Sequence, residues 1–138
     1  MTPERAFADT NLFLRYFTND VPQQADAVEA LLRRVVAGEL ALAVSQMVIA
    51  EIVWTLESFY RLSRLDIRRH VLAMINTPNV EVENEELIHR AMDLYAERNI
   101  DLIDAYNILW MQTAGLTIAY TFDTRHFSRV PFIQAKQP

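Results

Sequence analysis

The amino-acid sequence predicts an α/β fold in which helices cover both faces of a central, mostly parallel sheet. Short apolar stretches with strand character alternate along the chain with longer stretches whose apolar residues recur at helical spacing. Strands that are separated by helical crossovers pair in parallel, which places the helices on the sheet's faces. A length of 138 residues suits one domain with a single core, so we predict a three-layer α/β/α sandwich spanning residues 1–138.

In the first half of the chain, each expected element has a local signal. A short buried strand over residues 5–8 precedes a short helix over residues 11–17, which ends near the turn-forming stretch TNDVP. An amphipathic helix over residues 23–37 ends at Gly38. The apolar stretch ELALAV is typical of a strand, and Ser45 after it is a suitable N-cap for the next helix.

The second half continues the alternation. Further helices are expected over residues 46–60, 64–75, 85–98 and 102–114, with Ser45, Ser63, Asn84 and Asp101 at their starts. Gly115 closes the last of these helices. The stretch NVEVE is a weak strand, LTIAYTF is a strand that ends at Asp123, and VPFIQA is a candidate edge strand.

Composition excludes several kinds of site. The chain has two glycines and no cysteine, so it has no Gly-rich phosphate loop, disulfide, thiolate zinc site or thiol nucleophile. No apolar run approaches a membrane span, and the N-terminus lacks the apolar core of a signal peptide, so we expect a cytoplasmic protein without a membrane segment. The net charge of −5 is unusual for a nucleic-acid binder, although twelve of the thirteen basic residues are arginines, which bind phosphate bidentately.

Four acidic residues occupy positions that call for an explanation. Asp9 and Asp123 directly follow predicted strands, and ligands of open α/β sheets bind beyond the carboxyl ends of the strands. Glu51 and Asp104 are each the only charge in a strongly apolar helical stretch.

Each acid also has a structural explanation that the sequence leaves open. Asp9 and Asp123 suit a helix cap or a turn, and Glu51 suits a solvent-exposed helix stripe. Asp104 lies three residues after Asp101, as in a capping box, where its charge favours the helix dipole.

Crowded carboxylates repel one another, and a divalent cation removes that cost. Hard oxygen ligands without cysteine favour Mg²⁺ or Mn²⁺ over Zn²⁺. Such an ion activates water and stabilises charge on a phosphoryl oxygen, so the predicted chemistry is hydrolysis of a phosphodiester.

The stretches around these acids resemble the motifs of the PIN-domain ribonucleases, and within that family the VapC toxins of bacterial toxin–antitoxin pairs. FADTNLFLRYF resembles the opening Asp-Thr-Asn motif, and VSQMVIAEIVWTL resembles the helix that carries the second acid. IDLIDAYNILWMQ resembles the third motif, and YTFDTRHF resembles the closing Thr-Phe-Asp motif. The four stretches occur in the family's order and span nearly the whole chain.

The resemblance implies a PIN-like fold, Mg²⁺- or Mn²⁺-dependent endonucleolytic cleavage of RNA, and neutralisation by a small cognate antitoxin. The catalytic, metal-binding residues that it implies are Asp9, Glu51, Asp104 and Asp123. It also implies that Asn11 orients Asp9 and that Ser45 and Thr121 are hydrogen-bond partners around the metal. A homodimer and an apolar groove for the antitoxin's helix are further implications.

One departure from the family pattern concerns the last motif. Many relatives carry a further acid shortly after the position of Asp123, where this chain has TRHF. This departure leaves open whether Asp123 binds the metal directly or through water.

RNA needs a path to an acidic site, and the sequence offers two basic segments. Arg64 and Arg68 share a helix face, and Arg125 lies beside the last motif; all three are candidate phosphate contacts. The alternative for the first segment is a solvated face shared with Asp66. His126 is more typical of a surface or structural histidine than of a catalytic one.

Three other functions compete with a nuclease. The first is a PIN-like binding module that has lost catalysis. The second is a signalling receiver domain, which requires a lysine after a late strand, whereas the only lysine is Lys136 in the tail. A phosphatase with an aspartate nucleophile is disfavoured, because Asn11 stands two residues after Asp9, where a second aspartate is expected.

Overall fold

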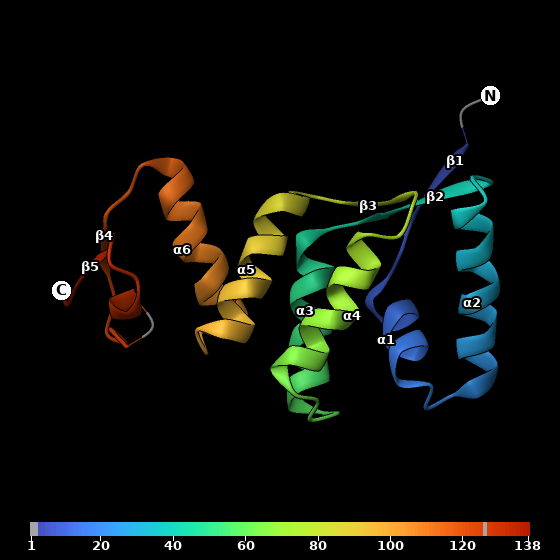
Figure 1. Ribbon diagram of the computed structural model, residues 1–138, viewed down its shortest axis with the longest axis horizontal. Helices are drawn as coiled ribbons and strands as arrows, with labels where there is room; N and C mark the ends of the chain where they lie inside the picture. Colours follow the sequence, from blue (N-terminus) through green and yellow to red (C-terminus); the bar gives the residue numbers. More distant parts are fainter. Residues whose placement is uncertain (1–2, 126) are drawn as a thin grey trace. The chain divides into compact units, whose positions relative to one another are not determined.

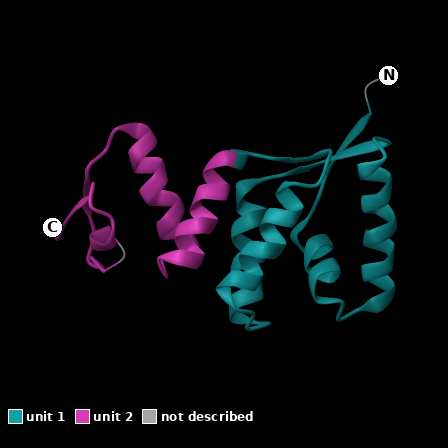
Figure 2. Ribbon diagram, viewed as in Figure 1, with its two compact units in different colours: residues 1–85 teal, residues 86–138 magenta. Residues whose placement is uncertain are grey.

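The computed structural model describes residues 3–125 and 127–138. The chain divides into two compact units, residues 1–85 and 86–138 (Figure 2). Among the described residues, no helix combines the length and the apolar character that crossing a bilayer requires.

Unit 1 contains a three-stranded parallel sheet. The strands β1 (Glu4–Phe7), β2 (Leu40–Val44) and β3 (Val80–Val82) lie in the order β1-β2-β3. Phe7 is paired with Ala43, and Val44 with Val82. The parallel pairing confirms the prediction from alternating strands and helices.

Two helices connect each pair of neighbouring strands (Figure 1). α1 (Thr10–Thr18) and α2 (Pro22–Val36) lie between β1 and β2 in the chain, and α3 (Gln46–Ser58) and α4 (Arg64–Ile75) lie between β2 and β3. Their buried apolar side chains give unit 1 its core. The fully buried ones include Val35, Ile49, Ile52, Leu56, Ile67 and Val71.

Two of the predicted serine caps are confirmed. The Ser45 hydroxyl accepts a hydrogen bond from the Val48 backbone N–H at 3.3 Å and starts α3. The Ser63 hydroxyl accepts one from the Asp66 N–H at 3.1 Å and starts α4. Each bond satisfies one of the backbone donors that a helix start leaves without an intrahelical partner.

The first strand differs from its prediction. Glu4, Arg5 and Phe7 are exposed and Ala6 is half-buried, so the expectation of a buried strand is wrong in unit 1. The reason is that β1 is an edge strand of the three-stranded sheet. Ala8, which follows it, is fully buried.

Unit 2 holds the remaining elements. Helix α5 (Glu85–Glu97) starts at the boundary between the units and is followed by α6 (Leu102–Ala114), which ends at Gly115 in the left-handed conformation (φ 74°). The helices are followed by β4 (Ile118–Tyr120), the short 3-10 helix η1 (Phe127–Arg129) and β5 (Gln134–Lys136), with β4 and β5 paired in parallel.

The last strand starts later than predicted. The expected edge strand covered residues 130–135, whereas β5 is Gln134–Lys136. Pro131 has no N–H to donate to a strand ladder, and the segment around it turns instead, with the Ile133 N–H bonded to the Val130 carbonyl at 3.2 Å.

Candidate functional site

In unit 1, Asp9 and the start of α3 lie at the same edge of the sheet. The strand pairing of Phe7 with Ala43 is extended by a 3.0 Å bond from the Ala8 N–H to the Ala43 carbonyl. Asp9 and Ser45 then follow the carboxyl ends of β1 and β2 at equivalent positions. This edge is where ligands of parallel sheets bind.

Asp9 occupies the N-cap position of α1 with extended backbone angles, as the capping alternative predicts. Its side chain makes no capping hydrogen bond, however, and is exposed. Asn11 lies in the first turn of α1 and is also exposed, and among the described residues no hydrogen bond joins it to Asp9. The Asp9 carboxylate is therefore accessible to a cation.

Glu51 lies on the exposed face of α3, within the helix that Ser45 caps. The same face carries Met47 and Trp54, which are 78% and 67% exposed. Glu51 therefore lies on a solvent-exposed stripe of α3 in unit 1, as its structural explanation predicts. The neighbours of Glu51 on that stripe are large apolar side chains.

In unit 2, Asp101 and Asp104 lie at the start of α6. Asp101 is the N-cap residue by position, without a side-chain capping bond, and Asp104 lies in the first turn, half-buried. Asp101 therefore starts the helix as predicted, although its side chain makes no N-cap hydrogen bond.

Asp123 follows β4 and is bound by its neighbour Arg125. The Arg125 Nε donates to Asp123 Oδ1 at 3.1 Å, and Nη2 donates to Oδ2 at 3.0 Å. The backbone N–H of Arg125 also donates to Oδ1, at 3.2 Å. The result is a bidentate pair in which the guanidinium engages both carboxylate oxygens.

Thr121 holds the backbone of this turn. Its hydroxyl donates to the Asp123 carbonyl at 3.1 Å and accepts from the Asp123 N–H at 3.0 Å. Thr121 is itself tied to β5, since its N–H donates to the Lys136 carbonyl at 2.9 Å. Thr121 therefore positions Asp123 through the main chain.

The acids of unit 2 act on Arg125 electrostatically. The pKa of Arg125 is raised above its usual value by the hydrogen bonds to Asp123, then by the charge of Asp123, with a further contribution from the charge of Asp101. The start of α6 and the turn after β4 are thus close enough to interact.

The arginines of α4 have partners of their own. Arg64 forms an ion pair with Glu57 at 3.3 Å, and Arg69 forms one with Asp66 at 2.7 Å. Arg68 lies half-buried on the same helix as Arg64.

The four predicted acids are divided between the units, with Asp9 and Glu51 in unit 1 and Asp104 and Asp123 in unit 2. Within neither unit do three or more His, Cys, Asp or Glu side chains of the described residues form a metal-binding group. The donor chemistry nevertheless fits Mg²⁺ or Mn²⁺, because all four are carboxylates that are exposed or half-buried.

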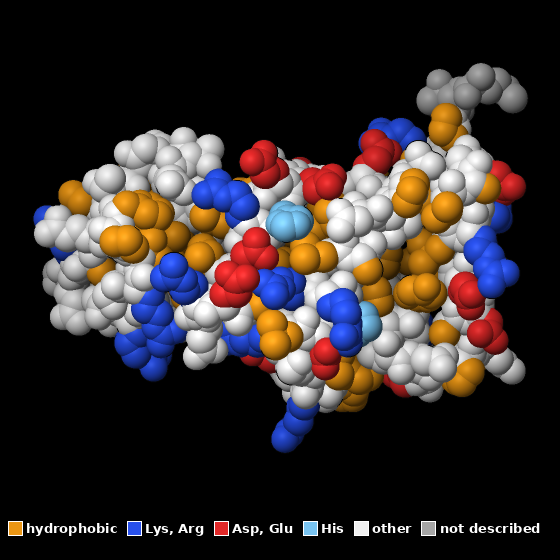
Figure 3. Space-filling model, in the orientation of Figure 1, with side chains coloured by type: hydrophobic (Ala, Val, Ile, Leu, Met, Phe, Trp, Pro, Cys, Tyr) orange, Lys and Arg blue, Asp and Glu red, His pale blue; other side chains and the backbone are white. Residues whose placement is uncertain are grey.

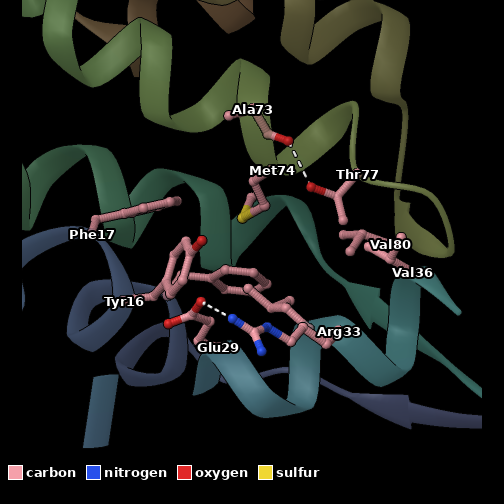
Figure 4. A pocket seen from close by; sticks show the side chains of 11 residues that line it. Tyr16, Phe17, Glu29, Arg33, Val36, Ala73, Met74, Thr77 and Val80 are labelled. Atoms are coloured by element: carbon pink, nitrogen blue, oxygen red, sulfur yellow. Dashed lines mark hydrogen bonds and ion pairs between the residues drawn. The ribbon is translucent and has the colours of Figure 1, made fainter. Parts of the chain in front are cut away.

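A second feature of unit 1 is an apolar groove formed by α1, α2 and α4, with a volume of about 400 Å³ (Figure 4). Apolar side chains gather over this region of the surface (Figure 3). The groove is lined by Phe13, Tyr16, Phe17, Glu29, Leu32, Arg33, Val36, Ala73, Met74, Thr77 and Val80. The Arg33–Glu29 ion pair, at 2.8 Å, is its charged element.

The sequence did not predict the ion pair of Asp123 with Arg125, and the family resemblance implied an apolar groove without locating it. The bidentate pair has a signal in the spacing Asp-x-Arg, which lets an arginine in a turn fold back onto a carboxylate. The groove could not be located from the sequence, because it is formed by three helices that are distant in sequence.

Comparison with known proteins gives a family match. The PIN domain model matches residues 6–133. No curated protein matches the chain in sequence.

Two solved structures resemble the chain. One is VapC20 of Mycobacterium tuberculosis, described as a sarcin-ricin loop cleaving toxin, with 16% identity over 89% of this chain and 93% of that chain, and a TM-score of 0.39. The other belongs to a toxin–antitoxin complex from Klebsiella pneumoniae, with 21% identity over 95% of this chain and 96% of that chain, and a TM-score of 0.35.

Proposed function

The chain belongs to the PIN-domain family, and from this premise we propose that it is an Mg²⁺- or Mn²⁺-dependent endoribonuclease of the VapC toxin type. Membership confirms the predicted PIN-like α/β fold. The observation that carries the proposal is the extent of the family match, which includes Asp9, Glu51, Asp104 and Asp123 within residues 6–133. Because the match spans both units, we also propose that they form one nuclease domain.

Asp9, Glu51, Asp104 and Asp123 are the proposed metal-binding and catalytic residues. A divalent ion bound by carboxylates activates water and stabilises negative charge on a phosphoryl oxygen, which is the chemistry that RNA hydrolysis needs. The chain's own contribution is to position the acids. Ser45 fixes the start of the helix that carries Glu51, and Thr121 fixes the backbone of Asp123.

Cleavage of RNA is the direct test. We expect the purified chain to cut total RNA in the presence of Mn²⁺ and to stop when EDTA is added. Asp9→Asn and Glu51→Gln should each lower the cleavage rate by about 100-fold or more, because a lost ligand weakens the metal site. Asp26→Asn, which removes an exposed aspartate of α2, is the matched control. Full activity in Asp9→Asn would refute the proposal.

A PIN-like binding module without catalysis is the alternative. Such a module would bind RNA or protein with no effect of Mn²⁺ on cleavage and no effect of Mn²⁺ on thermal stability. A metal-dependent rise in the melting temperature that is lost in Asp9→Asn would argue against it.

The proposed protein partner is a cognate antitoxin that inserts an amphipathic helix into the groove of α1, α2 and α4. The apolar lining suits the apolar face of such a helix, and the Arg33–Glu29 pair offers charges to its polar edge. Val36→Glu should abolish co-purification with a co-expressed cognate antitoxin and leave RNA cleavage intact. Leu65→Glu, at an exposed leucine outside the groove, is the control.

We further propose that the toxin is a cytoplasmic homodimer. Support for association comes from Met47, Trp54 and Phe59, three large apolar side chains of unit 1 that are exposed. Met47 and Trp54 share one face of α3, and exposed apolar patches commonly mark protein interfaces. Light scattering after gel filtration should give the mass of a dimer for the wild type and a lower average mass for Trp54→Glu.

A further inference from the structure

Arg125 differs from several other arginines that pair with an acid. Arg5, Arg15, Arg33, Arg34 and Arg69 each donate one hydrogen bond to their carboxylate partner. Arg125 instead engages both oxygens of Asp123 with its guanidinium, at 3.1 and 3.0 Å. These are the oxygens with which Asp123 would coordinate a metal ion.

The Arg125–Asp123 ion pair has good hydrogen-bond geometry, but either side chain can exchange its partner. Both side chains are well exposed, 77% for Arg125 and 50% for Asp123, and exposed ion pairs contribute little to stability. A divalent ion brings twice the charge of a guanidinium to the same carboxylate. A guanidinium that leaves a carboxylate can bind an RNA phosphate instead, because phosphate accepts the same two parallel hydrogen bonds from arginine.

We propose that Arg125 competes with the divalent ion for Asp123 and transfers to an RNA phosphate when the ion binds. This inference rests on the proposed function and assigns Arg125 a positioning role within it. In the ion pair, Arg125 orients the carboxylate and balances its charge. Once released, its guanidinium neutralises the phosphate backbone beside the acids, which would otherwise repel RNA.

Unit 2 supplies a reason for Arg125 to stay close when it is released. The charge of Asp101, at the start of α6, also favours the charged guanidinium. The backbone N–H of Arg125 also donates to Asp123 Oδ1, so the main chain at Arg125 remains beside the carboxylate. The side chain can therefore exchange partners without loss of the turn.

Metal affinity is the first readout of the test. Isothermal titration of the full chain with Mn²⁺ should show about two- to five-fold tighter binding for Arg125→Ala than for the wild type, because the competing ion pair is gone. Arg90→Ala is the control, since it removes the same charge from an arginine that bonds to Gln112. A purely structural Arg125 would give weaker binding of Mn²⁺ after substitution, which would overturn the inference.

RNA affinity is the second readout and should change in the opposite direction. With Ca²⁺ present, a fluorescent single-stranded RNA should bind Arg125→Ala more weakly than Arg90→Ala. The slope of log affinity against log salt concentration should also be shallower for Arg125→Ala, by about the value of one phosphate contact. Without divalent ions, Asp123→Asn should bind the RNA more tightly than Asp26→Asn does. That gain should disappear in the double variant Asp123→Asn with Arg125→Ala.

The outcomes separate the inference from the proposed function. If the wild type does not bind Mn²⁺ at all, the proposed function fails. If the wild type binds Mn²⁺ and Arg125→Ala matches Arg90→Ala in both metal and RNA affinity, only the role of Arg125 is refuted.

Discussion

The Tyr60 hydroxyl donates a 2.6 Å hydrogen bond to Asp20 Oδ2, which ties the end of α3 to the turn between α1 and α2. Asp20 also accepts a 2.9 Å bond from the Thr18 hydroxyl, and it pairs with Arg15 at 3.5 Å. These contacts join two segments that are forty residues apart in the chain. They hold α1 and α3 together at their C-terminal ends. Asp9 is the N-cap residue of α1, and Glu51 lies in α3.

Removal of this bond should make stability less dependent on pH. The pKa of Asp20 lies below its usual 3.8, first because of the Tyr60 hydrogen bond and then because of that from Thr18. A carboxyl group whose pKa is lower in the folded than in the unfolded protein stabilises the fold at pH values above the unfolded-state pKa. This contribution is lost as the pH falls through the folded-state pKa. Tyr60→Phe should therefore melt below the wild type at neutral pH, and the gap should shrink in acid. Tyr120→Phe, at an exposed tyrosine, should show no such gap, and an equal gap at every pH would contradict the assignment.

A core substitution should cost far more than a surface one of the same chemistry. Leu56 on α3 is fully buried, whereas Leu65 on α4 is 60% exposed. Leu56→Ala should lower the free energy of unfolding by about 3 kcal/mol, through lost burial and a remaining cavity. Leu65→Ala should change it by less than about 0.5 kcal/mol. Urea denaturation measures both, and similar losses in the two variants would mean that the core of unit 1 is misassigned.

The two capping serines offer a matched pair that separates stability from function. Ser45→Ala and Ser63→Ala should each lower the free energy of unfolding by about 1 kcal/mol, because each leaves a backbone N–H of a first turn without its partner. Ser45→Ala should slow RNA cleavage more than Ser63→Ala does, since Ser45 starts the helix of Glu51 and α4 carries none of the proposed metal ligands. Equal activity of the two variants would remove Ser45 from the proposed site.

A histidine beside the groove should make the protein sensitive to mild acid. His70 stacks on Phe17 with ring centroids 4.7 Å apart. Its pKa is lowered from 6.5, chiefly by burial and secondly by the charge of Arg69, while Asp66 acts in the opposite direction. When folding lowers the pKa of a histidine, the folded protein is more stable at pH values above the unfolded-state pKa. That stability is lost as the pH falls below the unfolded-state pKa.

His70→Phe keeps the stacking and removes the titration. Between about pH 7.5 and about pH 5.5, it should lose less stability than the wild type. His89→Gln, which changes an exposed histidine that lies 3.7 Å from Asp93, should follow the wild-type pH profile. Chemical denaturation at each pH gives the comparison, and parallel profiles for all three proteins would rule out His70 as the source.

Local signals in the sequence were enough to predict most helix boundaries. Ser45 and Ser63 cap the helices that they were expected to cap, because a cap depends on residues within one turn. The parallel sheet followed from the alternation of strands and helices. The exposure of β1 could not be predicted in this way, because burial depends on which strands lie beside it.

The predicted site followed from motifs, and the missed features come from packing. Asp9 and the start of α3 share a sheet edge because β1 and β2 pair in register, as expected for a parallel sheet. The pairing of Arg125 with Asp123 depends on how a turn folds, and the groove depends on three packed helices. Such features need three-dimensional neighbours that sequence spacing does not reveal.

Binding of Mn²⁺ to the wild-type chain and to single variants of its four acids tests the central claim most directly. Isothermal titration should show binding to the wild type and to the control Asp26→Asn. Asp9→Asn, Glu51→Gln and Asp104→Asn should each weaken that binding by about ten-fold or more, and Asp123→Asn should weaken it as well. If Glu51→Gln and Asp104→Asn bind Mn²⁺ as tightly as Asp26→Asn does, the four acids do not hold the metal and the account is wrong.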